Sequence, residues 1–327
     1  MHRISRFMIS TLAASGLWLM SAEPVAAEGR MKNVLCYTPT PAPAPREIAV
    51  QGEALPVLSL PEMEVGQEAA FQSAPEENVL ETTIEGGMSI KNQTGYFVDP
   101  AELLRSGADI TLPAEDVQIL IIHTHSSEAY TQAGLDRYRP SDTNRTEDTK
   151  FNIVRIGDEL TQILTEEGLN VIHDRGIYDY PSYTGSYTRS GEAVQQYLES
   201  YPGIGIVLDI HRDALGSEGV VYKTMAEEEG VCASQIMLLA GSDGSGLEHP
   251  DWRRNLALAV YLQNAVLENN PTLMRPISLV NERYNQHLCP GSLIVEVGSS
   301  GNTLQEALAA VRLFGRAIAP ELRALVQ

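Results

Sequence analysis

The sequence predicts an α/β fold in which a mainly parallel, twisted sheet carries helices on both of its faces. Beyond Asp116, short apolar runs alternate with amphipathic helical stretches, the order that produces parallel strands. The runs are almost continuously apolar, as expected of strands covered on both faces. The chain has 327 residues, of which 43% are apolar, enough for one α/β domain with a tail.

An export signal is predicted at the start of the chain. Basic residues come first, an apolar run spans Phe7–Met20, and small residues follow at 25–27; this order is typical of export signals. We expect residues 1–27 to be a signal peptide or a signal anchor. Cleavage is favoured because the run is shorter than the roughly 20 residues that span a bilayer. Both alternatives make the protein extracytoplasmic, either secreted or anchored on the outer face of the membrane.

Residues 28–80 are rich in proline, alanine and glutamate, a composition that predicts a linker. Proline fixes φ, and the stretch has too little apolar surface to offset the entropy lost on ordering. We therefore expect an extended spacer, followed by one catalytic domain at residues 81–327.

Within this domain the elements follow from apolar periodicity. A short strand and a helical turn are expected between Thr82 and Pro113. Compact apolar runs predict strands at Val117–Ile122, Asn170–His173, Ile204–Ile210, Ser234–Leu239, Ile277–Asn281 and Leu293–Val297. Apolar stripes with helical spacing predict helices over 151–166, 190–199, 252–268 and 303–326.

Composition excludes several classes of function. The formal net charge of -20 repels nucleic-acid phosphates, so we expect no nucleic-acid partner. The three cysteines show no CxxC spacing, which argues against a disulfide scaffold or a cysteine-based zinc knuckle. A disulfide between Cys232 and Cys289 remains an alternative, although two separate buried thiols are favoured.

Three predicted strands end in residues that bind metals or transfer protons. His123 and His125 follow the first strand with Glu128 three residues on, His211 ends another, and Glu296 lies near the end of the last. Each residue alone is compatible with a satisfied structural role. Because the carboxyl ends of parallel strands meet at one sheet edge, however, the coincidence predicts a common site.

The residue types in this set suit a zinc hydrolase. Two histidines and a carboxylate form a common catalytic zinc shell with a position left for water, and a further carboxylate can move the water's proton to the leaving group. We assign His125, Glu128 and His211 as Zn²⁺ ligands and Glu296 as general base and acid.

Three neighbouring residues keep alternatives open. His123 competes with His125, or else orients the water or stabilises the oxyanion. Asp148 competes with Glu128 as the carboxylate ligand. Arg212 binds substrate or forms a structural ion pair.

A tyrosine-rich stretch, residues 178–187, is also predicted to lie at the surface. Its tyrosines either stack on sugar faces or serve ordinary loop packing.

Three motifs together resemble the stage II sporulation protein P family. They are His-Thr-His-Ser-Ser-Glu-Ala-Tyr at 123–130, Asp-Ile-His-Arg-Asp-Ala at 209–214 and Leu-Ile-Val-Glu-Val-Gly-Ser-Ser-Gly-Asn-Thr at 293–303. The resemblance runs from about residue 80 to the end of the chain. It also includes Phe151-Asn152-Ile153-Val154-Arg155-Ile156-Gly157.

This resemblance implies a divergent N-acetylmuramoyl-L-alanine amidase, with a fold similar to that of amidases and zinc carboxypeptidases. It implies zinc-dependent cleavage of peptidoglycan between muramic acid and L-alanine, with peptide crosslinks as additional targets, during sporulation and engulfment. A septal lytic transglycosylase and a membrane anchor protein are the implied partners. His125 or His123, His211 and Glu296 fall in the matching motifs, whereas Glu128 and Asp148 remain alternatives for the metal carboxylate. The short signal departs from the firm membrane anchor expected of the family.

Two rival functions remain. A zinc carboxypeptidase-like peptidase would use the same residue types, but it needs a cationic clamp for a terminal carboxylate. A catalytically inactive wall-binding module would retain the fold without turnover, and the presence of His125, His211 and Glu296 argues against it.

Overall fold

The computed structural model describes residues 78–82, 88–217, 219–228 and 230–327. The predicted signal at residues 1–27 and the predicted linker up to residue 77 lie outside these ranges. Strand β1 (Asn78–Thr82) begins in the last three residues of the stretch predicted as linker. Within the described ranges, no helix combines the length and apolarity needed to cross a bilayer.

In the described part of the chain, seven strands form the central sheet in the order β2-β10-β9-β11-β5-β3-β4. All neighbouring pairs are parallel except β9 and β11, which confirms the predicted mainly parallel sheet. The strands are β2 Ile90–Asn92, β3 Ile119–Ile122, β4 Val171–His173, β5 Ile206–Asp213, β9 Ile236–Ala240, β10 Ile277–Leu279 and β11 Ser292–Ser299.

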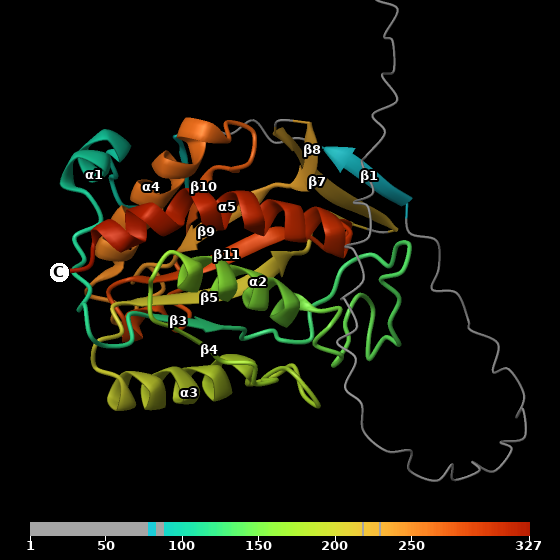
Figure 1. Cartoon of the computed structure of the whole chain (residues 1–327), viewed down its shortest axis with the longest axis horizontal. Helices are drawn as coiled ribbons and strands as arrows, with labels where there is room; N and C mark the ends of the chain where they lie inside the picture. Colours follow the sequence, from blue (N-terminus) through green and yellow to red (C-terminus); the bar gives the residue numbers. More distant parts are fainter. Residues whose placement is uncertain (1–77, 83–87, 218, 229) are drawn as a thin grey trace, which may run out of the picture. The chain divides into compact units, whose positions relative to one another are not determined.

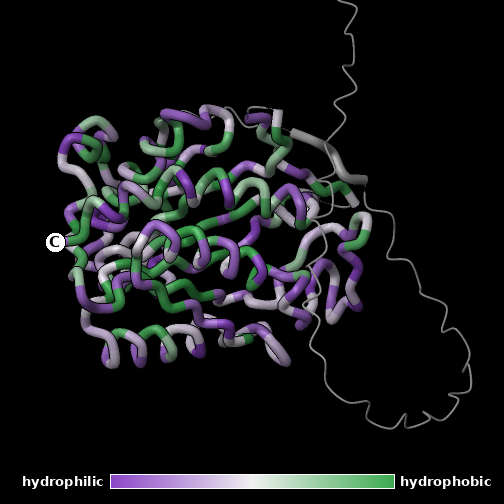
Figure 2. Tube along the Cα trace, viewed as in Figure 1, coloured by the Kyte–Doolittle hydropathy of each residue, from purple (hydrophilic) through white to green (hydrophobic). Residues whose placement is uncertain are grey.

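Helices cover both faces of this sheet (Figure 1). Strand β3 shows why: Ile119 and Ile121 pack with helices α2, α4 and α5 on one face, whereas Leu120 and Ile122 pack with α3 on the other. Figure 2 shows the hydrophobic residues concentrated between these layers. The helices are α1 Pro100–Ser106, α2 Ile153–Glu166, α3 Ser186–Ser200, α4 Trp252–Asn269 and α5 Leu304–Ala324, with a short 3₁₀ helix at Gln286–Leu288.

The helix starts have local causes. The Asn152 side chain accepts a hydrogen bond from the backbone of Val154 and so caps α2. Thr303 and Glu306 form a capping box at the start of α5. Such caps satisfy backbone N–H groups that have no partner inside the helix. Helix α3 begins at Ser186, so the last tyrosine of the stretch predicted as surface loop lies on a helix.

A second, small sheet was not predicted. It joins β1, β6 (Gly216–Ser217), β7 (Val220–Glu228) and β8 (Val231–Ser234). Exposed and buried residues mix along β7, whereas the prediction relied on compact apolar runs.

The predicted strand Ser234–Leu239 is confirmed from Ile236 onward as β9, but its predicted start is wrong. Ser234 pairs antiparallel with Met225 in the small sheet, and β9 of the central sheet begins at Ile236. The two strands separate at the buried Gln235, whose side chain donates to the carbonyl of Thr272 at 3.0 Å. Because the chain passes from the small sheet to the central sheet at this point, residues 234–239 cannot form one continuous strand.

Strands β3, β5 and β11 position the candidate site. They are adjacent and parallel, and Glu296 on β11 lies directly opposite His211 on β5. The segment that follows β3 therefore reaches the same edge as the ends of the other two strands.

Candidate metal centre

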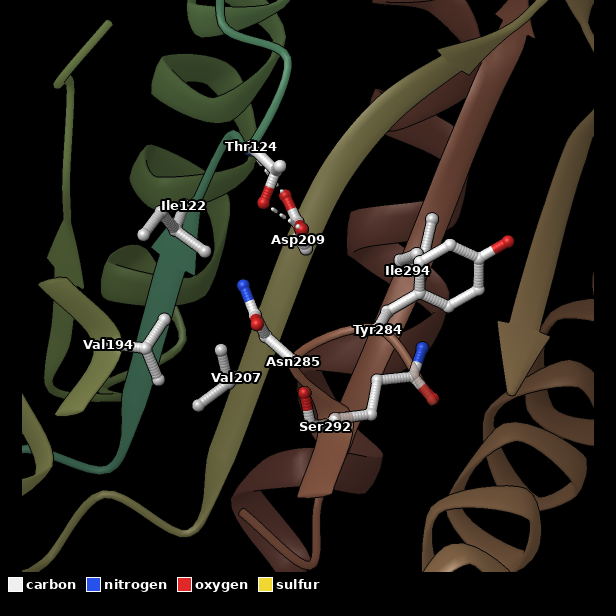
Figure 3. Close-up of a pocket in the computed structure, with 10 residues that line it drawn as sticks. Ile122, Thr124, Val194, Val207, Asp209, Tyr284, Asn285, Ser292 and Ile294 are labelled. Atoms are coloured by element: carbon white, nitrogen blue, oxygen red, sulfur yellow. Dashed lines mark hydrogen bonds between the residues drawn. The ribbon is translucent and has the colours of Figure 1, made fainter. Parts of the chain in front are cut away.

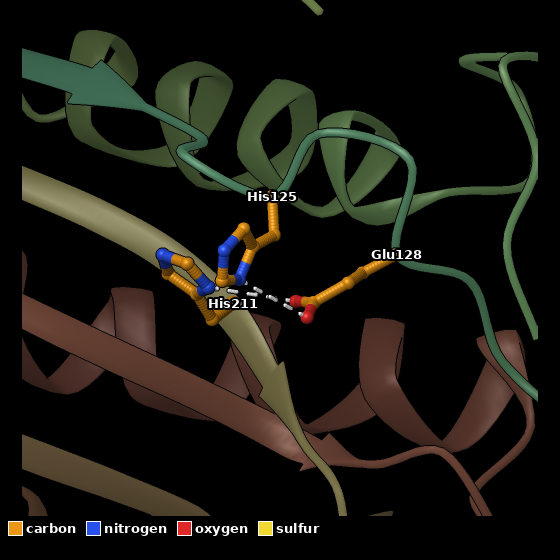
Figure 4. Close-up of side chains that lie close together, drawn as sticks. All are labelled: His125, Glu128 and His211. Atoms are coloured by element: carbon orange, nitrogen blue, oxygen red, sulfur yellow. Dashed lines mark ion pairs between the residues drawn. The ribbon is translucent and has the colours of Figure 1, made fainter. Parts of the chain in front are cut away.

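His125, Glu128 and His211 come together at this sheet edge (Figure 4). Each offers one ligand atom, and these atoms all lie within 4.8 Å of one another. All three residues are buried. His211 is held by β5, and a turn after β3 supplies the other two, because the backbone N–H of Glu128 donates to the carbonyl of His125 at 3.0 Å.

The donor set suits a catalytic zinc site. Nδ1 of His125 and Nδ1 of His211 each lie 3.5 Å from a carboxylate oxygen of Glu128. Among the described residues, Nε2 of His125 and Oε2 of Glu296 are buried without a hydrogen-bond partner. This is uncommon for buried polar atoms unless a ligand, ion or water binds there. Two imidazoles with one carboxylate match the ligands of open zinc sites.

Cationic groups keep Glu128 ionised. Burial by itself would raise the pKa of this carboxyl, but Arg212 and hydrogen bonds from His125 and His211 outweigh burial and hold the pKa well below its usual value. Arg145 adds a contact, with Nη2 3.3 Å from Glu128 Oε1. The carboxyl group is therefore charged at neutral pH.

Asp209 orients His211 from the same strand. Nε2 of His211 lies 2.9 Å from Asp209 Oδ1, an ion-pair distance without the alignment of a hydrogen bond. Both oxygens of Asp209 also accept from Thr124, at 2.8 Å from its N–H and 2.6 Å from its hydroxyl. Burial opposes the charged imidazole, yet Asp209 and Glu128 raise the pKa of His211 well above its usual value. Metal binding would have to displace this proton.

Glu296 lies beside the cluster in a different electrostatic environment. The residue is partly exposed, while its Oε2 atom is buried. Burial raises the pKa of Glu296 to about 8, with His211 and Arg212 opposing the shift and Asp213 and Glu128 adding to it. A carboxyl with a raised pKa can hold and release a proton near neutral pH.

His123 points away from this cluster. Its Nδ1 lies 3.0 Å from the carbonyl of Ile210 and its Nε2 lies 2.8 Å from Nε2 of His173, which in turn contacts Asp158 at 3.2 Å. Burial and His173 lower the pKa of His123 to about 3, and burial lowers that of His173 to about 4. The pair is therefore neutral at pH 7 and lies behind the site.

The other two alternatives also lie outside the cluster. Asp148 is exposed, and its Oδ1 accepts from the backbone of Lys150 at 3.1 Å. Arg212 is buried, and its guanidinium donates to the carbonyls of Ala129, Asn144 and Asp213 at 2.9, 3.1 and 3.4 Å. A contact between this guanidinium and substrate would require these bonds to break.

Several residues around the site were not singled out from the sequence. Asp209 carries a signal, because a charged residue two positions before His211 interrupts an apolar strand and faces the same side. Arg145 and Asp179 carry none: they come from separate loops and meet only in the fold, at 2.5 Å.

A small cavity lies beneath the site, between the sheet and α3 (Figure 3). It measures about 10 Å³ and is lined in part by Thr124, Asp209 and Asn285. This is room for about one water molecule. The cavity is therefore too small for a substrate, and none of His125, Glu128 and His211 lines it.

No disulfide joins Cys232 and Cys289 in the structure, and Cys289 is a buried free thiol. Burial raises the pKa of this thiol, so it is a poor nucleophile at neutral pH.

Comparison with known proteins places these residues in context. A family model described as stage II sporulation protein P matches residues 45–319. Stage II sporulation protein P of Bacillus subtilis (strain 168) is 24% identical over 203 residues, which cover 58% of this chain and 47% of the relative. The chain thus spans about half the length of the curated relative that it matches.

Among solved structures, two amidases illustrate the similarity. N-acetylmuramoyl-L-alanine amidase AmiC2 of Nostoc punctiforme is 12% identical with a TM-score of 0.34, covering 63% of this chain and 97% of that one. An N-acetylmuramoyl-L-alanine amidase from Clostridium difficile 630 is 10% identical with a TM-score of 0.38, covering 64% and 99%.

Proposed function

The chain belongs to the stage II sporulation protein P family, and we propose that it is a zinc-dependent peptidoglycan hydrolase that cleaves the amide bond between N-acetylmuramic acid and L-alanine. The observation that carries this proposal is the buried cluster of His125, Glu128 and His211 with Glu296 beside it. A donor set for zinc next to a carboxyl that can exchange protons is the minimal equipment for amide hydrolysis.

His125, Glu128 and His211 would hold the zinc. When bound, the metal lowers the pKa of a water ligand toward about 7 and polarises the scissile carbonyl. Asp209 fixes the ring of His211, and Arg212 keeps Glu128 charged, so the ligands are oriented before any metal arrives.

Glu296 is assigned to proton transfer. As a carboxylate it accepts a proton from the attacking water at Oε2, the buried oxygen for which the described part of the chain supplies no hydrogen-bond partner. It then delivers that proton to the amine of L-alanine as the amide bond breaks. Burial raises the pKa of Glu296 to about 8, and His211 and Arg212 oppose this shift. The carboxylate form that the first step needs therefore becomes the major form only above about pH 8.

The test is digestion of purified peptidoglycan sacculi by the full chain with and without zinc, followed by mass spectrometry. We expect stem peptides with a free L-alanine amine, and no release after chelation. Glu296→Gln should retain zinc and lose turnover by roughly 10²–10⁴-fold. Glu167→Gln, an exposed carboxylate at the end of α2, is the matched control and should behave as the wild type.

The same products decide between this proposal and its rivals. Release of single C-terminal amino acids would indicate a carboxypeptidase-like peptidase. Such an enzyme needs a cationic clamp for the terminal carboxylate, but the Arg212 guanidinium already donates to main-chain carbonyls. Binding to sacculi with zinc present and no product would indicate an inactive wall-binding module.

The setting of this activity is part of the proposal. We propose that the protein acts outside the cytoplasmic membrane, secreted or membrane-anchored, on the cell wall during sporulation and engulfment. A septal lytic transglycosylase and a membrane anchor protein are the proposed partners, and cleavage of peptide crosslinks is a proposed additional activity.

A further inference from the structure

The loop at residues 174–185 borders the metal centre and presents tyrosines to solvent. Tyr180 is 46% exposed and Tyr183 is 56% exposed. The ring of Tyr183 stacks on the imidazole of His125, with ring centroids 4.6 Å apart and an interplanar angle of 27°. Arg145 lies over the same ring, with Cζ 5.1 Å from its centroid. An exposed aromatic ring thus flanks a proposed metal ligand.

Hydrogen bonds from Ser127, Arg145 and Arg189 hold this loop in place. The carboxylate of Asp179 accepts from the N–H and hydroxyl of Ser127 at 3.0 and 2.6 Å, and from Arg145 at 2.5 Å. From α3, the guanidinium of Arg189 donates to the carbonyls of Tyr178, Ser182 and Thr184. The ring of Tyr183 is therefore presented on an ordered loop, which reduces the entropy lost when a ligand binds.

Two further tyrosines extend the aromatic surface across the site. Tyr187 meets His125 edge-on at 5.4 Å between ring centroids, and Tyr284 lies 5.3 Å from Tyr187. Burial is the main cause that raises the pKa of both phenols, and the charge of Glu296 contributes in each case. The ring contacts therefore extend the aromatic surface from His125 through Tyr187 to Tyr284.

This arrangement suits a pyranose ring. The axial C–H groups of a sugar present a flat, apolar, weakly positive face, which complements the negative face of an aromatic ring. Although His125 and Arg145 contact the Tyr183 ring, 56% of this residue remains exposed and accessible to a sugar. If the scissile amide is bound at the metal, its muramic acid ring must lie within a few ångströms of it, and Tyr183 is the exposed ring stacked on a metal ligand.

We propose that Tyr183 forms a saccharide subsite that binds the N-acetylated pyranose of the glycan strand adjacent to the scissile amide. This inference rests on the proposed function, because it takes the metal centre as the place where the amide is cut. Tyr183 is a specificity residue in this scheme: it contacts the sugar and takes no part in proton transfer.

The test uses a peptide-free disaccharide of N-acetylglucosamine and N-acetylmuramic acid, which has no amide for an amidase to cleave between sugar and peptide. Binding to the zinc-loaded full chain is measured by NMR titration. Tyr183→Ala should weaken binding roughly five- to tenfold, the effect of losing one stacking contact, whereas Tyr183→Phe, which keeps the ring, should stay within about twofold of the wild type. Zinc content should be unchanged in both variants.

Tyr201→Ala is the matched control, because Tyr201 is also exposed (37%) and follows the far end of α3; it should bind as the wild type. Unchanged binding by Tyr183→Ala, or equal losses in Tyr183→Ala and Tyr183→Phe, would overturn the proposal. The readout needs no turnover, so ring-dependent binding in a protein that releases no stem peptides would support the subsite while rejecting the amidase assignment.

Discussion

At the scale of single residues, the proton-transfer role proposed for Glu296 comes with a cost in stability. Its pKa of about 8 in the folded protein lies above the value of an exposed glutamate, near 4.3. A raised carboxyl pKa stabilises the fold fully below the unfolded pKa, and that contribution is lost as pH rises through the folded pKa. The metal-free protein should therefore lose stability between about pH 4 and pH 8 through this group.

Replacement of Glu296 by Gln should remove that loss. We expect metal-free Glu296→Gln to be more stable than metal-free wild type at pH 8.5 by a few kcal/mol, below the full value of the shift because the side chain is partly exposed. At pH 4.5 the two proteins should be nearly equal. Chemical denaturation at both pH values measures the difference, and an equal difference at both would contradict the assignment.

At the scale of elements, the fit of α2 against the ends of β3 and β4 depends on a glycine. A Cβ at Gly157 would lie 2.5 Å from Nε2 of His123 and 2.5 Å from Nε2 of His173. Both imidazoles are held by hydrogen bonds or ion pairs and have little freedom to move. The close approach of α2 therefore supports the histidine pair behind the metal site.

Gly157→Ala tests this packing. Alanine favours a helix over glycine by about 1 kcal/mol, but the clash should outweigh that gain and destabilise the protein by about 2 kcal/mol. Gly315→Ala on α5 is the matched comparison, because its methyl would meet flexible Ile163 and Leu160 side chains at 3.1 Å and should cost less. Urea denaturation midpoints measure both variants, and a stabilising Gly157→Ala would show that the pair can move aside.

At the scale of the whole molecule, the metal site links segments that lie far apart in the chain. His125 and Glu128 follow β3, whereas His211 belongs to β5. The unfolded chain does not hold these residues together, so metal binding should favour the folded state by mass action. Glu128 and Asp209 hold a proton on His211, so zinc binding should also become tighter as pH rises.

Zinc should therefore raise the melting temperature. At free zinc about 100-fold above its dissociation constant, the stabilisation is about 2.7 kcal/mol, or roughly 5–10 °C for a domain of this size. Calorimetry with zinc or with chelator measures the shift. His211→Ala should abolish it, and the exposed-surface variant Glu167→Gln should keep it; a full shift in His211→Ala would place the zinc elsewhere.

Local sequence determined the central sheet, its helices and the clustering of the site at one edge. The strand at Ile119–Ile122 could be predicted because a strand buried on both faces is a compact apolar run. The helix at Ile153–Glu166 could be predicted because its apolar residues recur with helical spacing. Because parallel strands end at one edge of a sheet, the sequence alone predicts that His125, His211 and Glu296 lie close together.

Only the tertiary structure decided which of the competing side chains share one space. The sequence offered His123 beside His125 and Asp148 beside Glu128, and their spacing could not separate them. The chain turns directly after β3, which sends His123 behind the sheet to His173 and leaves Asp148 exposed. Arg145, Asp179 and Tyr183 reach the site from loops, and β7 joins a second sheet. Such long-range contacts depend on chain geometry and leave no periodic signal in the sequence.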